Sequence, residues 1–244
     1  MAKSKLLLVF SKLVIFFTFA IVSISNATAE VNIDKTRLII NANDRFAELS
    51  LVNSAEYPTA IQLWTDAGNI LAYPSEELTP VFVLPPIFKL EPGEIRQIKV
   101  MLNRSDLKDV TSESLFWLNI LQVPQDINPQ GMDNEDNVAK VTLPLRYRLK
   151  ILVRPNGVQK PSDTDYQDIN FKIVGNQLHI SNQTHWHMNF LSIQIGDEVI
   201  ERVTTLPLSV QVKPLNMMNL NTNHIRYTII SDEGQLIEFT KNIQ

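Results

Sequence analysis

Apolar and polar residues alternate over short segments throughout residues 31–154. Segments 47–52 and 97–102 place an apolar side chain at every second position, and segment 115–121 is apolar except for Asn119. A period of two is typical of strands with one buried face, and a short continuous apolar run is typical of a central strand. Turn-forming residues separate these runs, and only segment 104–111 has a helical or turn-like composition. The pattern predicts an all-β sandwich.

A polar, turn-rich segment interrupts the strand pattern at residues 156–165. We interpret it as a hinge between a first domain, residues 30–155, and a second domain, residues 166–244. The second domain begins with a predicted hairpin at residues 171–182, which has a two-residue turn. Further strands are predicted at residues 190–195, 208–212, 225–230 and 236–240.

The N-terminus combines a basic region, an apolar run and a small-residue cleavage site. Three lysines precede or border the run Val14–Val22, and Ala27-Thr28-Ala29 follows it. This run of nine residues is short, because roughly 20 are needed to span a bilayer. We therefore predict a secretory signal peptide, residues 1–29, that is cleaved after Ala29. Cleavage would leave 215 of the 244 residues in the exported protein.

Composition excludes several classes of function. The chain contains no cysteine, so disulfide scaffolds, thiol catalysis and Cys-bound zinc are excluded. The formal net charge is −4, and it becomes −7 when the three lysines of the signal peptide are removed from the 22 basic residues. An acidic chain gives no reason to expect a nucleic-acid partner. No phosphate-binding loop or nucleophile-elbow motif is present, and no cofactor is expected.

The longest alternating segment lies at the end of the first domain, at residues 138–153. An acidic, turn-rich loop, residues 126–136, precedes it. Such a strand after such a loop is typical of an edge strand that can pair with another chain, although a core strand of a large sandwich would also fit the periodicity. Five apolar residues occupy every second position: Val141, Leu143, Leu145, Tyr147 and Leu149.

Segment 113–124 closely resembles the signature of the periplasmic pilus-assembly chaperones. Further segments resemble this family in the same order, at residues 34–37, 60–64, 82–93 and 150–155. The resemblance spans most of residues 31–155 and is thinner in the second domain, where it lies chiefly at residues 227–234. Ser112 and Gln125 depart from the usual pattern, because the family has a charged residue or Gln at the first position and a small residue or Pro at the second.

The resemblance implies two immunoglobulin-like sandwiches set at an angle, with a cleft between them. Family members bind newly exported pilin subunits that lack the last strand of their own sandwich. They lend an edge strand to the subunit until an outer-membrane usher exchanges it for the next subunit. The chain is therefore expected to be a periplasmic chaperone rather than an enzyme, and its donor edge could pair with a second copy when no subunit is bound.

The resemblance also implies roles for individual residues. Arg37 and Lys150 match the family's anchor for the C-terminal carboxylate of the subunit, and Val141 to Leu149 match the donor strand. Two cations that converge on one carboxylate make strong hydrogen bonds and fix the register of an added strand. The residues that match the charged link between the two domains are Glu113, Arg154 and Asp232.

Two other functions remain open at this point. The first is a structural or adhesive fibre subunit with a β-sandwich fold, which would require an N-terminal donor extension that the sequence does not show. The second is an exported hydrolase or metalloenzyme, which depends on a histidine cluster in the second domain: His179, His185 and His187. Surface or hairpin histidines are the simpler interpretation of that cluster, and no metal site is predicted.

Overall fold

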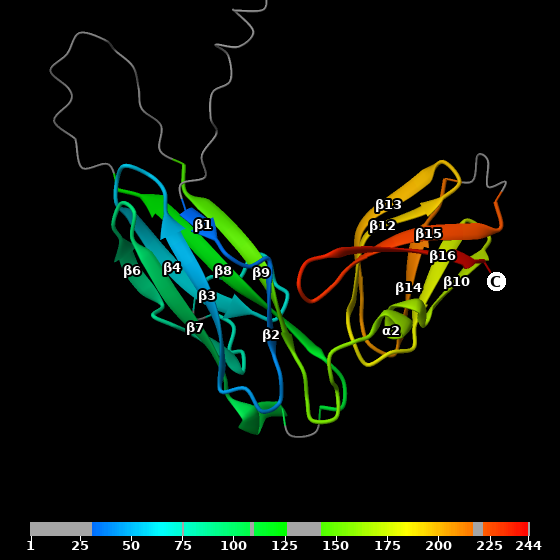
Figure 1. Ribbon diagram of the computed structural model, residues 1–244, viewed down its shortest axis with the longest axis horizontal. Coiled ribbons are helices and arrows are strands. Elements are labelled where there is room, and N and C mark those ends of the chain that lie inside the picture. The colour runs from blue at the N-terminus through cyan, green and yellow to red at the C-terminus, as the bar shows by residue number, and fades with distance from the viewer. Residues whose placement is uncertain (1–30, 75, 108–109, 126–142, 217–221, 244) are drawn as a thin grey trace, which may run out of the picture.

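The computed structural model describes residues 31–74, 76–107, 110–125, 143–216 and 222–243. These residues form two β-sandwich domains that lie side by side and are joined at one end (Figure 1). The predicted all-β class with two sandwiches is confirmed. Within the described residues, no helix has the length and apolar character needed to cross a membrane. The predicted signal peptide lies outside the described residues.

The N-terminal domain packs a five-stranded sheet against a four-stranded sheet. The larger sheet contains, in spatial order, β2 (Arg37–Ile40), β9 (Leu145–Val153), β8 (Ser114–Pro124), β4 (Thr59–Asp66) and β6 (Ile87–Leu90). The smaller sheet contains β1 (Val31–Ile33), β3 (Phe46–Asn53), β7 (Ile95–Leu102) and β5 (Val81–Leu84). A short 3-10 turn, η1 (Arg104–Leu107), follows β7 where a helical or turn segment was predicted. The alternating residues of β3, β7 and β8 fill the space between the sheets.

The C-terminal domain has the same two-layer plan. One sheet contains β10 (Ile169–Val174), β11 (Gln177–Asn182) and β14 (Ser209–Pro214). The other contains β13 (Glu198–Thr205), β12 (Met188–Ile195), β15 (His224–Ile230) and β16 (Leu236–Asn242). Three aromatic rings form the centre of the core, and the rings of Phe171 and Tyr227 are 5.1 Å apart. The predicted hinge is partly helical, because α2 (Asp163–Gln167) begins inside it and buries Tyr166 against this core.

The β-rich stretch at residues 31–40 forms two strands in different sheets. β1 pairs with β3 of the smaller sheet, and β2 pairs with β9 of the larger sheet. Asp34 fixes the crossing point, because its carboxylate accepts a hydrogen bond from the Ser50 backbone at 2.8 Å and its own backbone N–H donates to the Ser50 carbonyl at 3.2 Å. Apolar periodicity does not reveal such a change of sheet, because both strands bury one face in the same core.

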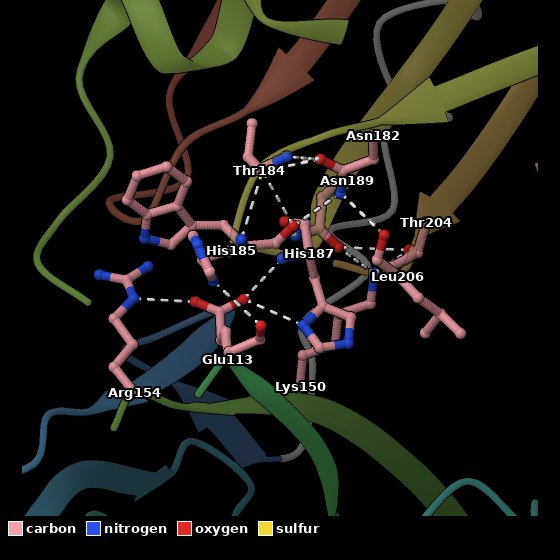
Figure 2. A network of polar contacts seen from close by, with 12 residues as sticks. Glu113, Lys150, Arg154, Asn182, Thr184, His185, His187, Asn189, Thr204 and Leu206 are labelled. Carbon is pink, nitrogen blue, oxygen red and sulfur yellow. Dashed lines mark hydrogen bonds and ion pairs between the residues drawn. The ribbon is translucent and has the colours of Figure 1, made fainter. Parts of the chain in front are cut away.

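A buried charge network joins the two domains. Arg154 Nε donates to Glu113 Oε2 at 2.8 Å, and the two terminal nitrogens of Arg154 donate to the Asp232 carboxylate at 2.7 Å each. Glu113 Oε1 accepts a hydrogen bond from the His187 backbone at 2.9 Å, as Figure 2 shows. Burial alone would lower the pKa of Arg154, but the hydrogen bonds and charges of Asp232 and Glu113 outweigh burial and raise it. Arg154 therefore stays charged between the domains.

Replacing Arg154 by Leu is expected to destabilise the protein by about 3–5 kcal/mol, because it leaves the fully buried carboxylate of Glu113 without its ion-pair partner. Urea unfolding followed by circular dichroism measures the change. Lys160→Ala is the matched control, since it removes the exposed Lys160–Glu233 pair and should shift the unfolding midpoint little. Equal midpoints for the two variants would show that the junction network contributes no more than a surface ion pair.

Candidate functional site

The strand β9 is paired along its full length on one edge and only along part of the other. β8 pairs with β9 from Leu145 to Val153, whereas β2 pairs with it only from Lys150 onward, where Arg37 lies opposite Lys150. No other described strand pairs with the edge of β9 at residues 145–149. That edge lies on the side of the N-terminal domain that faces the C-terminal domain (Figure 1). Its backbone groups can therefore form a hydrogen-bond ladder with another chain.

The apolar side chains next to this edge are largely exposed. Leu143, Leu145 and Tyr147 are 68%, 44% and 37% exposed, which is unusual for three large apolar residues at alternate positions. Leu149 was predicted to continue this series, but only 6% of it is exposed, because it packs in the core of its own domain. The exposed series therefore ends at Tyr147. Val141, its predicted first member, lies outside the described residues.

Arg37 and Lys150 lie side by side at the point where β2 begins to pair with β9. Arg37 Nη1 donates to the Ile230 carbonyl of the C-terminal domain at 3.2 Å, and the buried Arg37 Nε has no hydrogen-bond partner. The ammonium group of Lys150 donates to Asn189 Oδ1 and Thr204 Oγ1 of the C-terminal domain (Figure 2). All of these acceptors are neutral. Within the described part of the chain, neither cation forms an ion pair.

This arrangement leaves positive charge uncompensated in a half-buried place. Burial, together with the neighbouring positive charge of Arg37, lowers the pKa of Lys150 to about 8. Burial also lowers the pKa of Arg37, although the negative charge of Asp232 opposes this. Arg37 lines a pocket between β2 and the turn that joins β15 to β16. Burial removes the water that would otherwise stabilise the two positive charges. An anion bound here would stabilise both cations in place of that water.

The geometry also selects the chemical group that fits this place. A strand that paired with the open edge in the same direction as β9 would run from Leu145 toward Lys150, in line with β2. Its C-terminus would then meet Arg37 and Lys150, whereas an antiparallel strand would bring its positively charged N-terminus there. The two cations therefore favour a parallel strand that ends in a free carboxylate.

Sequence reasoning missed a second set of polar side chains, which lies on the face of β9 opposite Leu145 and Tyr147. Arg148 forms an ion pair with the fully buried Asp66 at 2.5 Å, and its guanidinium lies 4.4 Å from the centre of the Trp117 ring. Asn119 links the set, because its amide donates to Asp66 at 2.7 Å and its oxygen accepts from Arg146. The positions Arg146, Arg148 and Lys150 already alternate in the sequence, but their partners could be found only from the register of β4, β8 and β9.

The remaining predicted residues lie at the domain junction, with the exception of His179. Glu113, Arg154 and Asp232 meet as described above. His185 contacts Ser112 at 3.1 Å and His187 contacts Glu113 at 3.1 Å, so both histidines take part in contacts between the domains. His179 lies on β11. Among the described residues, no group of three His, Asp or Glu side chains could hold a metal ion.

Comparison with known proteins identifies the family. Residues 30–159 match the family model described as the N-terminal domain of PapD, a pili and flagellar-assembly chaperone. Residues 164–241 match the model of the C-terminal domain of the pili assembly chaperone PapD. Together the two models cover both sandwiches.

Similar proteins are known over most of the chain. The chaperone protein FimB/FhaD of Bordetella pertussis is 31% identical over 216 residues, which cover 85% of this chain and 86% of that protein. The chaperone protein HifB of Haemophilus influenzae is 28% identical over 75% of this chain and 77% of its own length.

Solved structures show the same fold. The complex of the Salmonella enterica SafA pilin with the SafB chaperone aligns with a TM-score of 0.73 at 24% identity, over 89% of this chain and 98% of that chain. The YadV chaperone aligns with a TM-score of 0.70 at 23% identity, over 88% and 100%. The immunoglobulin-like form of both sandwiches is thereby confirmed. Both domain matches and the long alignment with a curated chaperone place this chain in the PapD family of pili assembly chaperones.

Proposed function

We propose that this protein binds pilus or fimbrial subunits in the periplasm by lending them the open edge of β9. One observation carries the proposal: the unpaired edge ends at Arg37 and Lys150, two half-buried cations without an ion-pair partner among the described residues. An incomplete subunit has the complementary properties, because it lacks one strand and exposes an apolar groove with unpaired backbone groups. The proposed activity needs no catalytic step.

The donor edge supplies two kinds of interaction to such a subunit. Its backbone extends the ladder of hydrogen bonds, and its exposed apolar side chains fill the groove at every second position. In the described residues, the side chains available for this purpose are Leu143, Leu145 and Tyr147. Complete burial of one such side chain contributes roughly 1.5–3 kcal/mol. The predicted contribution of Val141 would extend the same series.

The anchor supplies direction and register. Because the C-terminal carboxylate of the subunit would be bound by Arg37 and Lys150, only one alignment of its last strand along β9 satisfies the charge. A shift of one residue would turn every apolar side chain of that strand to the wrong face.

Export and delivery complete the proposed function. The predicted signal peptide, cleaved after Ala29, would place the protein in the periplasm, and the family match agrees with that location. We propose that the bound subunit is then passed to an outer-membrane usher, where the incoming strand of the next subunit replaces β9. Such an exchange of one strand for another requires no nucleotide.

Replacing Arg37 or Lys150 by Ala is expected to weaken binding of a peptide with an alternating apolar sequence and a free C-terminal carboxylate by roughly 10–100-fold, because a charge-assisted hydrogen bond contributes about 1.5–3 kcal/mol. Titration calorimetry measures the affinity. Lys172→Ala, which removes an exposed cation of the C-terminal domain, is the control. Amidation of the peptide should abolish the difference between the variants and the wild type, and a persistent difference would argue against carboxylate anchoring.

Leu145→Glu is expected to reduce the affinity for the same peptide by at least tenfold, because a carboxylate would have to enter an apolar groove. The free protein should keep its stability, since Leu145 is 44% exposed. Leu236→Glu, on β16 of the other domain and 61% exposed, should leave the affinity unchanged. If both variants bind as the wild type does, the edge of β9 is not the donor.

Affinity for the peptide should depend on pH through Lys150. In the free protein the pKa of Lys150 is about 8, and a bound carboxylate raises it, so binding takes up a proton above that pH. The affinity should be constant below about pH 8 and fall by up to tenfold per pH unit above it, until the raised pKa of the complex is reached. Lys150→Ala should remove this dependence, whereas Arg37→Ala should keep it but move its onset to higher pH, because the Arg37 charge helps to lower the pKa of Lys150. A wild-type affinity that stays constant through pH 8–9.5 would show that the charge of Lys150 does not contribute to binding.

A further inference from the structure

A loop that contacts β9 through Arg146 presents large apolar side chains to solvent. This loop, residues 67–80, joins β4 to β5, and the structure describes all of it except residue 75. Ile70, Leu71 and Tyr73 are 61%, 77% and 70% exposed, and Leu78 is almost fully exposed. Single exposed apolar residues are common on protein surfaces, but a cluster in one short loop is typical of an interaction site.

The first part of the loop is held in a defined conformation. Gly68 N donates to Asp66 Oδ1 at 2.8 Å, and Ala72 N donates to the Asn69 carbonyl at 3.1 Å. Ala72 is buried, and its carbonyl accepts a hydrogen bond from the Trp64 indole at 3.2 Å. The apolar side chains on either side of Ala72 are therefore presented by an ordered backbone. A partner that covers them would have little loop entropy to overcome.

Arg146 ties this loop to the open segment of β9. Its Nη1 donates to the Ile70 carbonyl at 2.9 Å, while its Nε and Nη2 donate to Asn119 Oδ1 at 3.0 and 2.7 Å. Its guanidinium also lies 4.8 Å from the centre of the Trp64 ring. Arg146 belongs to the part of β9 that β2 leaves unpaired. In the described residues, the Arg146 side chain thus joins the loop to this segment of β9, on the face opposite Leu145 and Tyr147.

We propose that residues 70–73 of this loop form a second contact surface for the subunit bound at β9 and take an apolar side chain from the outward face of the subunit's last strand. The proposal rests on the proposed function. In the subunit's last strand, as in any paired strand, alternate side chains point to opposite faces. The side chains that do not enter the groove therefore lie on the same face of the sheet as Arg146 and the loop. Arg146 lies four positions before Lys150, which places the contacted residue about four positions before the subunit's C-terminus.

The test compares two synthetic peptides of about twelve residues, both with a free C-terminal carboxylate and Val at the groove-facing positions. The outward positions are Thr in one peptide, and the other has Phe at the fourth position before the C-terminus. The wild type should bind the Phe peptide roughly fivefold to tenfold more tightly. The double variant Leu71→Ser/Tyr73→Ser should bind both peptides equally. Arg146→Gln, which releases the loop from β9, should reduce the preference.

The matched control is Val199→Ser/Leu236→Ser, which removes two exposed apolar side chains of the C-terminal domain and should keep the full preference. The proposal is overturned if the wild type shows no preference or if the loop variant keeps it. It is also overturned if ultracentrifugation shows a wild-type dimer that the loop variant loses while the peptide preference persists, since the loop would then bind a second copy. Amidated versions of both peptides test the proposed function separately. Equal binding of the free and amidated forms would argue against the carboxylate anchor, while the preference for the Phe peptide could still be measured.

Discussion

β2 pairs with only four positions of β9, and no other strand of the described residues pairs with the rest of this edge. The boundary lies where Arg37 faces Lys150. An unpaired edge with apolar neighbours is a hazard for a soluble protein, because any exposed strand can add to it. Two properties of this edge restrict what can be added: Pro144 interrupts the donors of the ladder at its start, and the cations at its end favour a carboxylate. The edge that creates the hazard therefore also carries the features that restrict which strand can pair with it.

The C-terminal domain takes part in the site through neutral groups. The carbonyl of Ile230 and the side chains of Asn189 and Thr204 accept hydrogen bonds from the two cations without neutralising them. An acidic residue in their place would hold the cations more strongly but would compete with the carboxylate of a subunit. The acidic partners are instead found at Arg154, where Glu113 and Asp232 hold the domains in position. Charge is thus compensated at the junction between the domains and left without an acidic partner at the proposed binding site.

Much of this architecture could be predicted from the sequence, because strand periodicity is a local signal. The alternation in β3 and β7 follows from which side chains face the core. Leu149 shows the limit of that signal: it shares a face with Tyr147, but a period of two cannot tell whether that face is open or covered. The contacts of Asp66 and Arg146 could not be predicted at all, because they join three strands whose relative register appears only in the folded sheet. Arg37 and Lys150 were found through the family resemblance and not through their charge.

The change of sheet at residues 34–36 has a consequence for the length of the donor. Packed sheets lie about 10 Å apart, and three extended residues span about that distance, so the chain crosses between sheets with little slack. β1 is fixed by its pairing with β3, and Asp34 is hydrogen-bonded to Ser50. β2 therefore cannot begin earlier along β9 unless β1 also slides. If a pilus subunit ends at Arg37 and Lys150 as proposed, the distance between the two sheets of this domain sets the position along β9 at which the subunit's chain ends.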